Sequence, residues 1–171
     1  VLRTGPESFA AYKYVDASSM IKLFSNSVVT VNANVEGDKL SKKVNVNKGS
    51  VLTQVKKGTG AFTVQTPTTV ASVKGTEFMT RVDDLGMSTF IVTEGEVELR
   101  VLATDETSSV EKGKTAVINP DGVLQVREST YDDVSEIEKA ELESSQTSEP
   151  GLIRIPVLDK AGTLKYIEIS Y

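Results

Sequence analysis

The chain has 171 residues, of which 39% are hydrophobic and 25% charged, and this suits one globular domain with a small appendage. Its formal net charge of −5 argues against a general nucleic-acid binder, because binding to phosphates requires a basic surface. It contains neither histidine nor cysteine, which removes disulfides, thiol chemistry, the commonest general base and the usual zinc and copper ligands. No apolar run reaches about 18 residues, so we expect no membrane span within this chain.

Apolar and polar residues alternate in short runs along the N-terminal third, as is typical of half-buried β-strands. The clearest run is residues 29–35, which has Val29, Val31, Ala33 and Val35 on one face and is followed by a hairpin turn at 36–38. Since the chain opens at Val1 within a strand, we expect it to be a fragment whose N-terminal part is truncated. Further strands are expected at 2–5, 9–15, 21–23, 44–46 and 51–55.

The stretch 61–101 continues this alternation through runs that are closed by Gly, Pro or Asp. Pro67 ends the first run, because proline removes a donor from the ladder. Residues 103–109 are polar and expected to be exposed, whereas strands are expected at 117–118 and 123–127. About a dozen strands at spacings of roughly 8 to 12 residues predict an all-β sandwich, barrel or short solenoid.

The C-terminal part has a different character. Thr130 and Asp133 have the spacing of a capping box, with Asp where Glu or Gln is usual. One short helix is expected over about 132–143, docked by a narrow apolar stripe, and 144–151 reads as a linker. The alternation in 153–157 and 164–169 around a turn predicts a β-hairpin, which is barely stable alone and must pack on the β-unit, pair with another chain or begin a further domain. The predicted stripe consists of Tyr131, Val134, Ile137 and Ala140.

Two groups of acidic residues resemble catalytic or metal sites. Glu94, Glu96 and Glu98 could supply paired carboxylates for glycoside hydrolysis, but residues spaced two apart share one face of a strand, which favours a solvated face. Asp83-Asp84 and Asp121 could bind calcium, but neither loop has the spaced series of ligands that a calcium loop requires. Turn-forming aspartates are the favoured interpretation.

Three other patterns allow a functional interpretation beside a structural one. Gly58-Thr59-Gly60 follows two lysines but lacks the spacing of a phosphate-binding loop and leads into a strand. Gly75-Thr76 is explained by a tight turn that enters a strand. A glycan- or peptide-binding patch could form from Tyr12, Lys13, Tyr14 and Lys22, although tyrosines on a strand are more often half-buried with a wet hydroxyl group.

The central stretch contains a spaced set of residues that consists of Thr66-Pro67, Ala71, Val73, Gly75-Thr76-Glu77-Phe78, Val92, Glu94-Gly95 and Val97. This set resembles the core of the FecR-like domain, which occurs in extracytoplasmic parts of ferric-citrate-type sensor and anti-sigma regulators and in envelope proteins of unknown function. Ala17 departs from the Asp-Gly-Ser turn usual in that family. The resemblance implies a compact β-roll or solenoid-like arrangement rather than a regular immunoglobulin-type sandwich.

The resemblance implies that residues 1–128 form a FecR-like β domain, followed by a short helix and linker at 129–149 and a hairpin appendage or start of a further domain at 150–171. We expect an all-β, compact β-roll, solenoid-like or sandwich unit of many short strands, with one C-terminal helix and a terminal hairpin. The motif residues Thr66, Pro67, Gly75, Thr76, Phe78, Glu94 and Gly95 are expected to be structural.

In the regulators of this family the domain senses the occupancy of an outer-membrane transporter, so the resemblance implies a non-enzymatic protein-binding sensory module in the periplasm or on the surface of a bacterium. We expect no catalytic, cofactor or metal site. The alternatives are a structural or adhesive envelope module that binds glycan or a neighbouring protein and, third, a carboxylate glycosidase. A partner strand is expected to pair with the hairpin, whose candidate edge residues are Ile153, Ile155, Val157, Tyr166, Ile167 and Ile169.

Overall fold

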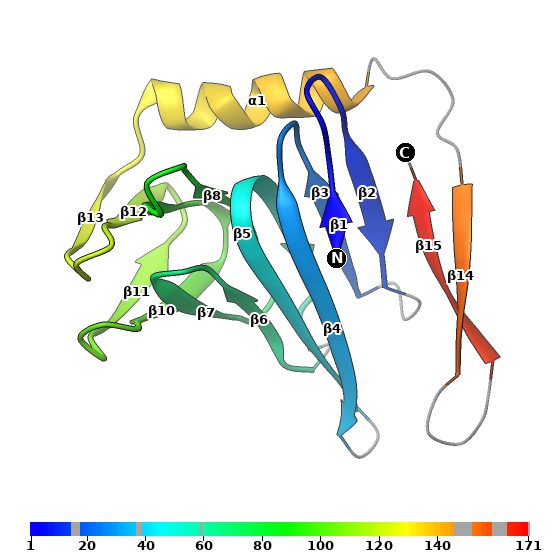
Figure 1. Cartoon of the computed structure of the whole chain (residues 1–171). Coiled ribbons are helices and arrows are strands. Elements are labelled where there is room, and N and C mark those ends of the chain that lie inside the picture. The colour runs from blue at the N-terminus through cyan, green and yellow to red at the C-terminus, as the bar shows by residue number, and fades with distance from the viewer. Residues whose placement is uncertain (15–17, 37–38, 59, 146–151, 159–163, 171) are drawn as a thin grey trace.

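The computed structural model describes residues 1–14, 18–36, 39–58, 60–145, 152–158 and 164–170. Fifteen strands and one helix are assigned within these residues (Figure 1). They are β1 (Leu2–Arg3), β2 (Ala10–Lys13), β3 (Ser19–Leu23), β4 (Val28–Glu36), β5 (Lys39–Val55), β6 (Phe62–Gln65), β7 (Thr69–Val73), β8 (Glu77–Val82), β9 (Ser88–Glu94), β10 (Glu96–Val101), β11 (Thr107–Glu111), β12 (Lys114–Ile118), β13 (Leu124–Glu128), α1 (Tyr131–Ser145), β14 (Leu152–Leu158) and β15 (Leu164–Ser170).

The strands form two layers that share β5. Sheet A has the order β1-β4-β5-β6-β7-β10-β11, and sheet B has the order β14-β15-β2-β3-β5-β8-β9-β12-β13. The β5–β6 pair is parallel, and the other pairings of the described strands are antiparallel. The expected all-β unit with one helix and a terminal hairpin is therefore confirmed.

Strand β5 is one strand of 17 residues, where the sequence pattern suggests two runs. Its first half pairs with β4 and β6 in sheet A, and its second half pairs with β3 and β8 in sheet B. The change of layer occurs at Gly49, which has a φ of 91°. A Cβ atom there would lie 2.5 Å from the Cα of Ser27, so this crossing requires glycine.

The main hydrophobic core lies between the two sheets. Sheet A contributes Val44, Val64 and Leu99, and sheet B contributes Phe78 and Phe90, all of them fully buried. The rings of Phe78 and Phe90 stack with their centroids 6.5 Å apart. The predicted alternation is confirmed in β6 and β10, where every second residue is apolar and points into this core. In β8 and β9 both faces are buried, because Phe78 and Phe90 face this core and Met79 and Ile91 face the opposite side.

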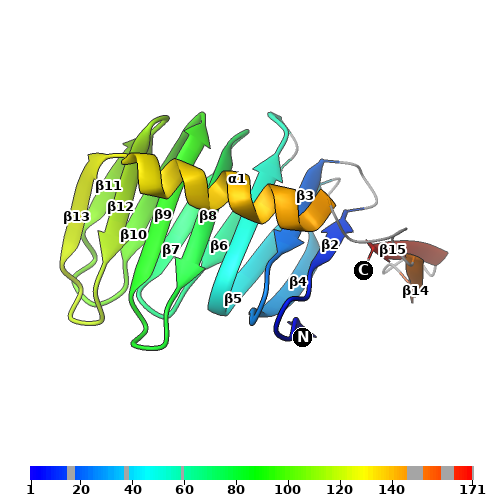
Figure 2. The same ribbon diagram turned by 90° about the horizontal axis from the view of Figure 1, so that it is seen from above.

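A second, smaller core lies on the outer face of sheet B, where α1 covers it (Figure 2). Leu52, Met79 and Ile91 are cross-strand neighbours in one row, and they pack with Phe24 against Ile137 of the helix. The helix thus buries an apolar row that would otherwise face solvent.

The predicted apolar stripe of the helix is wrong. Tyr131 is 84% exposed and Val134 is 41% exposed, whereas Ile137 is buried; the side chain of Ala140 lies outside the described residues. Residues three apart on a helix are rotated by about 60° from one another, so a period of three drifts off the buried face. The face toward the sheet follows a spacing of four instead, with Asp133, Ile137 and Glu141, and Glu141 forms an ion pair with Lys22 at 3.5 Å.

The helix begins at a polar anchor centred on the buried carboxylate of Asp133. The predicted capping box is confirmed: the amide of Thr130 donates to Asp133 Oδ2 at 2.7 Å, and the amide of Asp133 donates to Thr130 Oγ1 at 3.3 Å. Arg127 on β13 donates to both carboxylate oxygens at 2.5 and 3.1 Å, and Thr115 on β12 donates at 3.2 Å. These contacts, first among them those from Arg127, hold the pKa of Asp133 well below its usual range.

The segment after β10 and the C-terminal hairpin both form strands that extend the two sheets. The predicted exposure of residues 103–109 is confirmed, with Ser108 alone half-buried among them. Residues 107–111 form β11, which pairs with β10 at the edge of sheet A. An edge strand with solvent on its outer face shows little apolar alternation, so the pattern of residues 107–111 did not predict a strand. The predicted hairpin is confirmed as β14 and β15, and it joins sheet B through β2. The predicted turn residues 37–38 and 159–162, together with Ala17, lie outside the described residues.

We predict that Asp133→Asn lowers the free energy of unfolding at pH 7 by about 2–3 kcal/mol, because it removes charge-assisted hydrogen bonds from a buried position. Since the folded-state pKa of Asp133 lies below the unfolded value, this stabilisation is present above about pH 4 and is lost as the pH falls further. Urea unfolding at pH 7 and pH 3 measures both effects. The exposed Asp132 provides the control, since Asp132→Asn should change stability by less than about 0.5 kcal/mol.

Candidate binding surfaces

The family-motif residues lie mainly at structural positions. Thr66 Oγ1 accepts hydrogen bonds from Ser88 Oγ at 2.8 Å and from the amide of Thr69 at 3.1 Å, and Thr68 Oγ1 donates to Ser88 at 2.7 Å. This buried hydroxyl network ties the β6–β7 turn in sheet A to β9 in sheet B, with Pro67 exposed at the tip of the turn. Phe78 lies in the core.

Gly75, Thr76 and Gly95 form a close contact between two turns. Gly95 has a φ of 77°, and a Cβ atom on it would lie 2.8 Å from the carbonyl oxygen of Gly75 and 2.7 Å from Thr76 Cγ2. Thr76 is buried beneath this contact, whereas Glu94 beside it is exposed. The Gly-Thr and Glu-Gly pairs therefore allow the β7–β8 and β9–β10 turns to pack against each other.

The aromatic and basic patch considered above does not form. Tyr12 and Tyr14 are 3% and 7% exposed, with their rings edge to face at 5.6 Å, so both belong to the core rather than to a half-buried surface. Burial, together with the neighbouring Tyr14, raises the pKa of Tyr12. Lys13 is exposed on the opposite face of β2, and Lys22 contacts the helix.

Lys42 is a buried cation that the sequence analysis missed. It is 2% exposed, its Nζ donates a hydrogen bond to Ser18 Oγ, and it lies 5.2 Å from the centroid of the Tyr14 ring. The alternation contained the signal, since Lys42 shares its strand face with the buried Val44 and Val46. A buried amino group needs polar partners, and the hydroxyl group of Ser18, between β2 and β3, supplies one.

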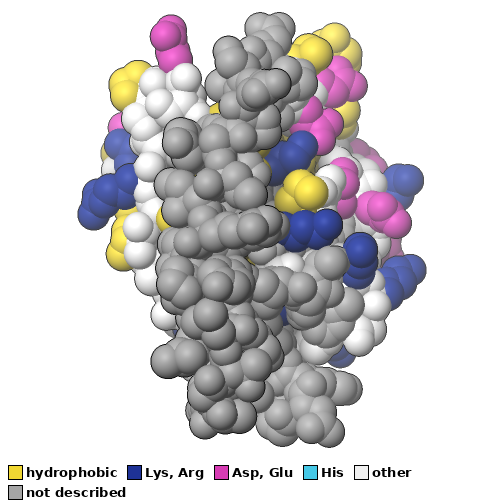
Figure 3. Space-filling model, turned by 90° about the vertical axis from the view of Figure 1, so that its right-hand side faces the viewer, with side chains coloured by type: hydrophobic (Ala, Val, Ile, Leu, Met, Phe, Trp, Pro, Cys, Tyr) yellow, Lys and Arg dark blue, Asp and Glu magenta, His cyan; other side chains and the backbone are white. Residues whose placement is uncertain are grey.

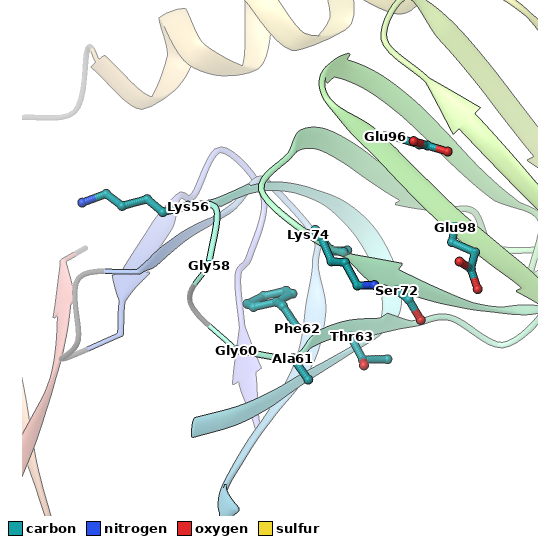
Figure 4. A pocket seen from close by; sticks show the side chains of 11 residues that line it. Lys56, Gly58, Gly60, Ala61, Phe62, Thr63, Ser72, Lys74, Glu96 and Glu98 are labelled. Carbon is teal, nitrogen blue, oxygen red and sulfur yellow. The ribbon is translucent and has the colours of Figure 1, made fainter. Parts of the chain in front are cut away.

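The outer face of sheet A is polar and carries an open groove of about 760 Å³. Figure 4 shows Glu96 and Glu98 on one side of this groove and Lys56 on the other, with Lys74 and Ser72 between them. Gly58 and Gly60, from the segment that lacks the spacing of a phosphate-binding loop, line the Lys56 side, and Thr59 lies outside the described residues. One row of cross-strand neighbours on this face consists of Asn32, Lys43, Thr63, Ser72, Glu98 and Ser109.

The acidic candidates lie in ordinary structural settings. Glu96 accepts a hydrogen bond from Ser109 on the neighbouring strand, and Asp83 Oδ1 caps its own loop by accepting from the amides of Leu85 and Met87, both at 2.9 Å. Asp84 forms an ion pair with Lys48 at 2.5 Å. No cluster of acidic residues able to hold a metal ion occurs among the described residues.

The hairpin forms the end of sheet B beyond β2, the end that Figure 3 views. The structure places Ile153, Ile155 and Val157 in β14, the last strand of the sheet order. Tyr166, Ile167 and Ile169 lie in β15, between β14 and β2, so these three residues belong to an inner strand. Among the helices that the structure describes, none has the length and apolar character needed to cross a bilayer.

We predict that Gly95→Ala lowers the free energy of unfolding by about 2–5 kcal/mol, because the added Cβ meets the facing turn and the residue has a left-handed conformation. Gly113 is the matched control, since its φ of 81° is similar but nothing lies within 4 Å of an added Cβ atom. Gly113→Ala should cost only about 1–2 kcal/mol. Equal losses in the two variants, measured by urea unfolding, would contradict a close-packing role for Gly95.

Comparison with known proteins agrees with this arrangement. Two solved structures of candidate anti-sigma factors from Parabacteroides distasonis ATCC 8503 share the fold, with TM-scores of 0.65 and 0.68 at 14% and 12% sequence identity. The alignments cover 78% and 94% of this chain but only 62% and 69% of those proteins. No curated protein matches. The model of the FecR protein family matches residues 1–98, more than half of the sequence, so the chain belongs to the FecR protein family.

Proposed function

We propose that the chain is a non-enzymatic protein-binding and sensory module of a transmembrane signalling regulator, located in the periplasm or on the surface of a bacterium. The observation that carries this proposal is the family match, which extends from β1 into β10 and includes both motif turns. The fold shared with candidate anti-sigma factors supports a regulatory role. The absence of histidine and cysteine and the structural setting of the acidic residues support a binding rather than a catalytic role.

We assign the partner-binding region to the end of sheet B that includes β2 and the hairpin. Sheets bind extended segments at their edges, because the backbone groups of an edge strand can pair with another chain. The outer face of sheet B is covered by α1 and offers no such surface at its centre. The partner is a protein of the cell envelope, such as an outer-membrane transporter or another surface protein.

A second candidate function is binding of envelope glycan, and the groove on sheet A favours it. Exposed amide, hydroxyl and charged side chains line this face, and polar groups of this kind can hydrogen-bond a polysaccharide. The groove residues Glu98 and Lys74 would then contact the polymer.

Photo-crosslinking with the full chain separates the two candidates. A photoreactive amino acid replaces exposed Lys13, beside the hairpin, in one variant, and exposed Glu98, in the groove, in the other. We expect the position 13 variant to crosslink to one envelope membrane protein and the position 98 variant to give no product. Polymer crosslinked from position 98, with no protein crosslinked from position 13, would overturn the first proposal in favour of the glycan module.

A further inference from the structure

We propose that strand β2 is the edge that receives the partner, and that the hairpin β14–β15 occupies this edge until an extended segment of the partner displaces it. This inference rests on the proposed function and names the strand that the partner contacts. Three observations support it: the direction of the backbone amides, the position of Pro156 in β14, and the short pairing between β15 and β2, which we call the joint.

The backbone groups of β2 point alternately toward its two neighbours. The amide of Tyr14 donates to the carbonyl of Ser19 at 3.1 Å, which fixes the hydrogen-bonded positions of the β2–β3 pair. In an antiparallel ladder these positions alternate, so Tyr12, paired with Ile21, also directs its N–H and C=O toward β3. Ala11 and Lys13 therefore direct theirs away from β3, toward β15.

The same alternation continues through the hairpin. Glu168 and Ser170 pair with Lys13 and Ala11, so their backbone groups face β2 and those of Ile167 face β14. Ile155 pairs with Ile167, so its backbone N–H and C=O groups face β15. The backbone groups of its neighbour Pro156 therefore face the outer edge of β14.

Pro156 interrupts the outer edge of β14. Proline has no N–H to donate, and prolines on edge strands are a common protection against pairing with another chain. The outward positions of β14 around it are Arg154 and Leu158, so a strand added there would lack a donor at the middle of the edge. The outer edge of the hairpin therefore pairs poorly with an added strand, whereas β2 offers the backbone N–H groups of both Ala11 and Lys13 as donors.

The joint between the hairpin and the sandwich is much smaller than the hairpin itself. β15 pairs with β2 at three positions, whereas β14 and β15 pair with each other at seven. Opening the joint thus breaks few backbone hydrogen bonds and leaves the hairpin ladder intact. Local opening of a small unit requires much less free energy than global unfolding.

The register between β15 and β2 also predicts which residue types a partner segment in the place of β15 would have. In the register of this pair, Ile169 is the partner of the buried Tyr12, and Glu168 is the partner of the exposed Lys13. Ser170 lies opposite Ala11. A partner segment that replaces β15 is accordingly an extended strand with an acidic residue, an apolar residue and a small residue in succession, in antiparallel orientation to β2.

Two engineered disulfides test this inference in the full chain, which has no cysteine of its own. Lys13→Cys with Glu168→Cys locks the joint, and Arg154→Cys with Glu168→Cys locks the hairpin internally as the matched control. Both pairs are direct cross-strand neighbours, whose Cα separations of about 4.5–5.5 Å suit a disulfide. The probe is a fluorescent peptide with the sequence of residues 164–171.

We expect the peptide to bind both reduced variants and the oxidised control, and to bind the oxidised joint lock at least tenfold more weakly. Equal binding to both oxidised proteins, or no binding to the reduced ones, would overturn the inference. A dimer in light scattering that the joint lock abolishes would identify the hairpin of a second copy as the occupant and overturn the assignment to a separate partner. Because the probe comes from the chain itself, failure of the envelope crosslinking would leave this result unaffected.

Discussion

The crossing of β5 from one sheet to the other at Gly49 joins the two sheets of the molecule. β5 is an inner strand of both sheets, pairing with β4 and β6 in sheet A and with β3 and β8 in sheet B. The main core lies between the two sheets that β5 joins. Ser27 secures the crossing, because its Oγ accepts from the amide of Ser50 and donates to the carbonyl of the same residue, both at 3.1 Å. The close approach of the two backbones leaves no room for a side chain on Gly49.

The outer faces of the two sheets differ in polarity, because α1 covers one of them and the other is open to solvent. Sheet B has an apolar row that α1 buries, with Asp133 at one end of the contact and Glu141 at the other, while sheet A has a polar row open to solvent. The helix-covered face of sheet B and the grooved polar face of sheet A therefore present different surfaces to solvent.

Sequence reasoning found the features that depend on neighbouring residues. Alternation located most strands and the core positions along 62–101, and the spacing of Thr130 and Asp133 located the helix start. It missed Lys42, because residue type was given more weight than position in the alternation, and it chose a period of three for the helix contact. Strand pairing could not be read from the sequence, since β2 is joined to β15 from the other end of the chain. The outward position of Pro156 became meaningful only with that register.

Amide hydrogen exchange in the intact chain measures whether the hairpin leaves the edge of β2. The amides of Ala11 and Lys13 face the hairpin, and the amide of Tyr12 between them faces β3. If the hairpin is a replaceable occupant of the β2 edge, Ala11 and Lys13 exchange at least tenfold faster than Tyr12, because opening the joint exposes only the first two. Equal protection of all three amides would show that the hairpin is a permanent part of sheet B and not a replaceable occupant of the β2 edge.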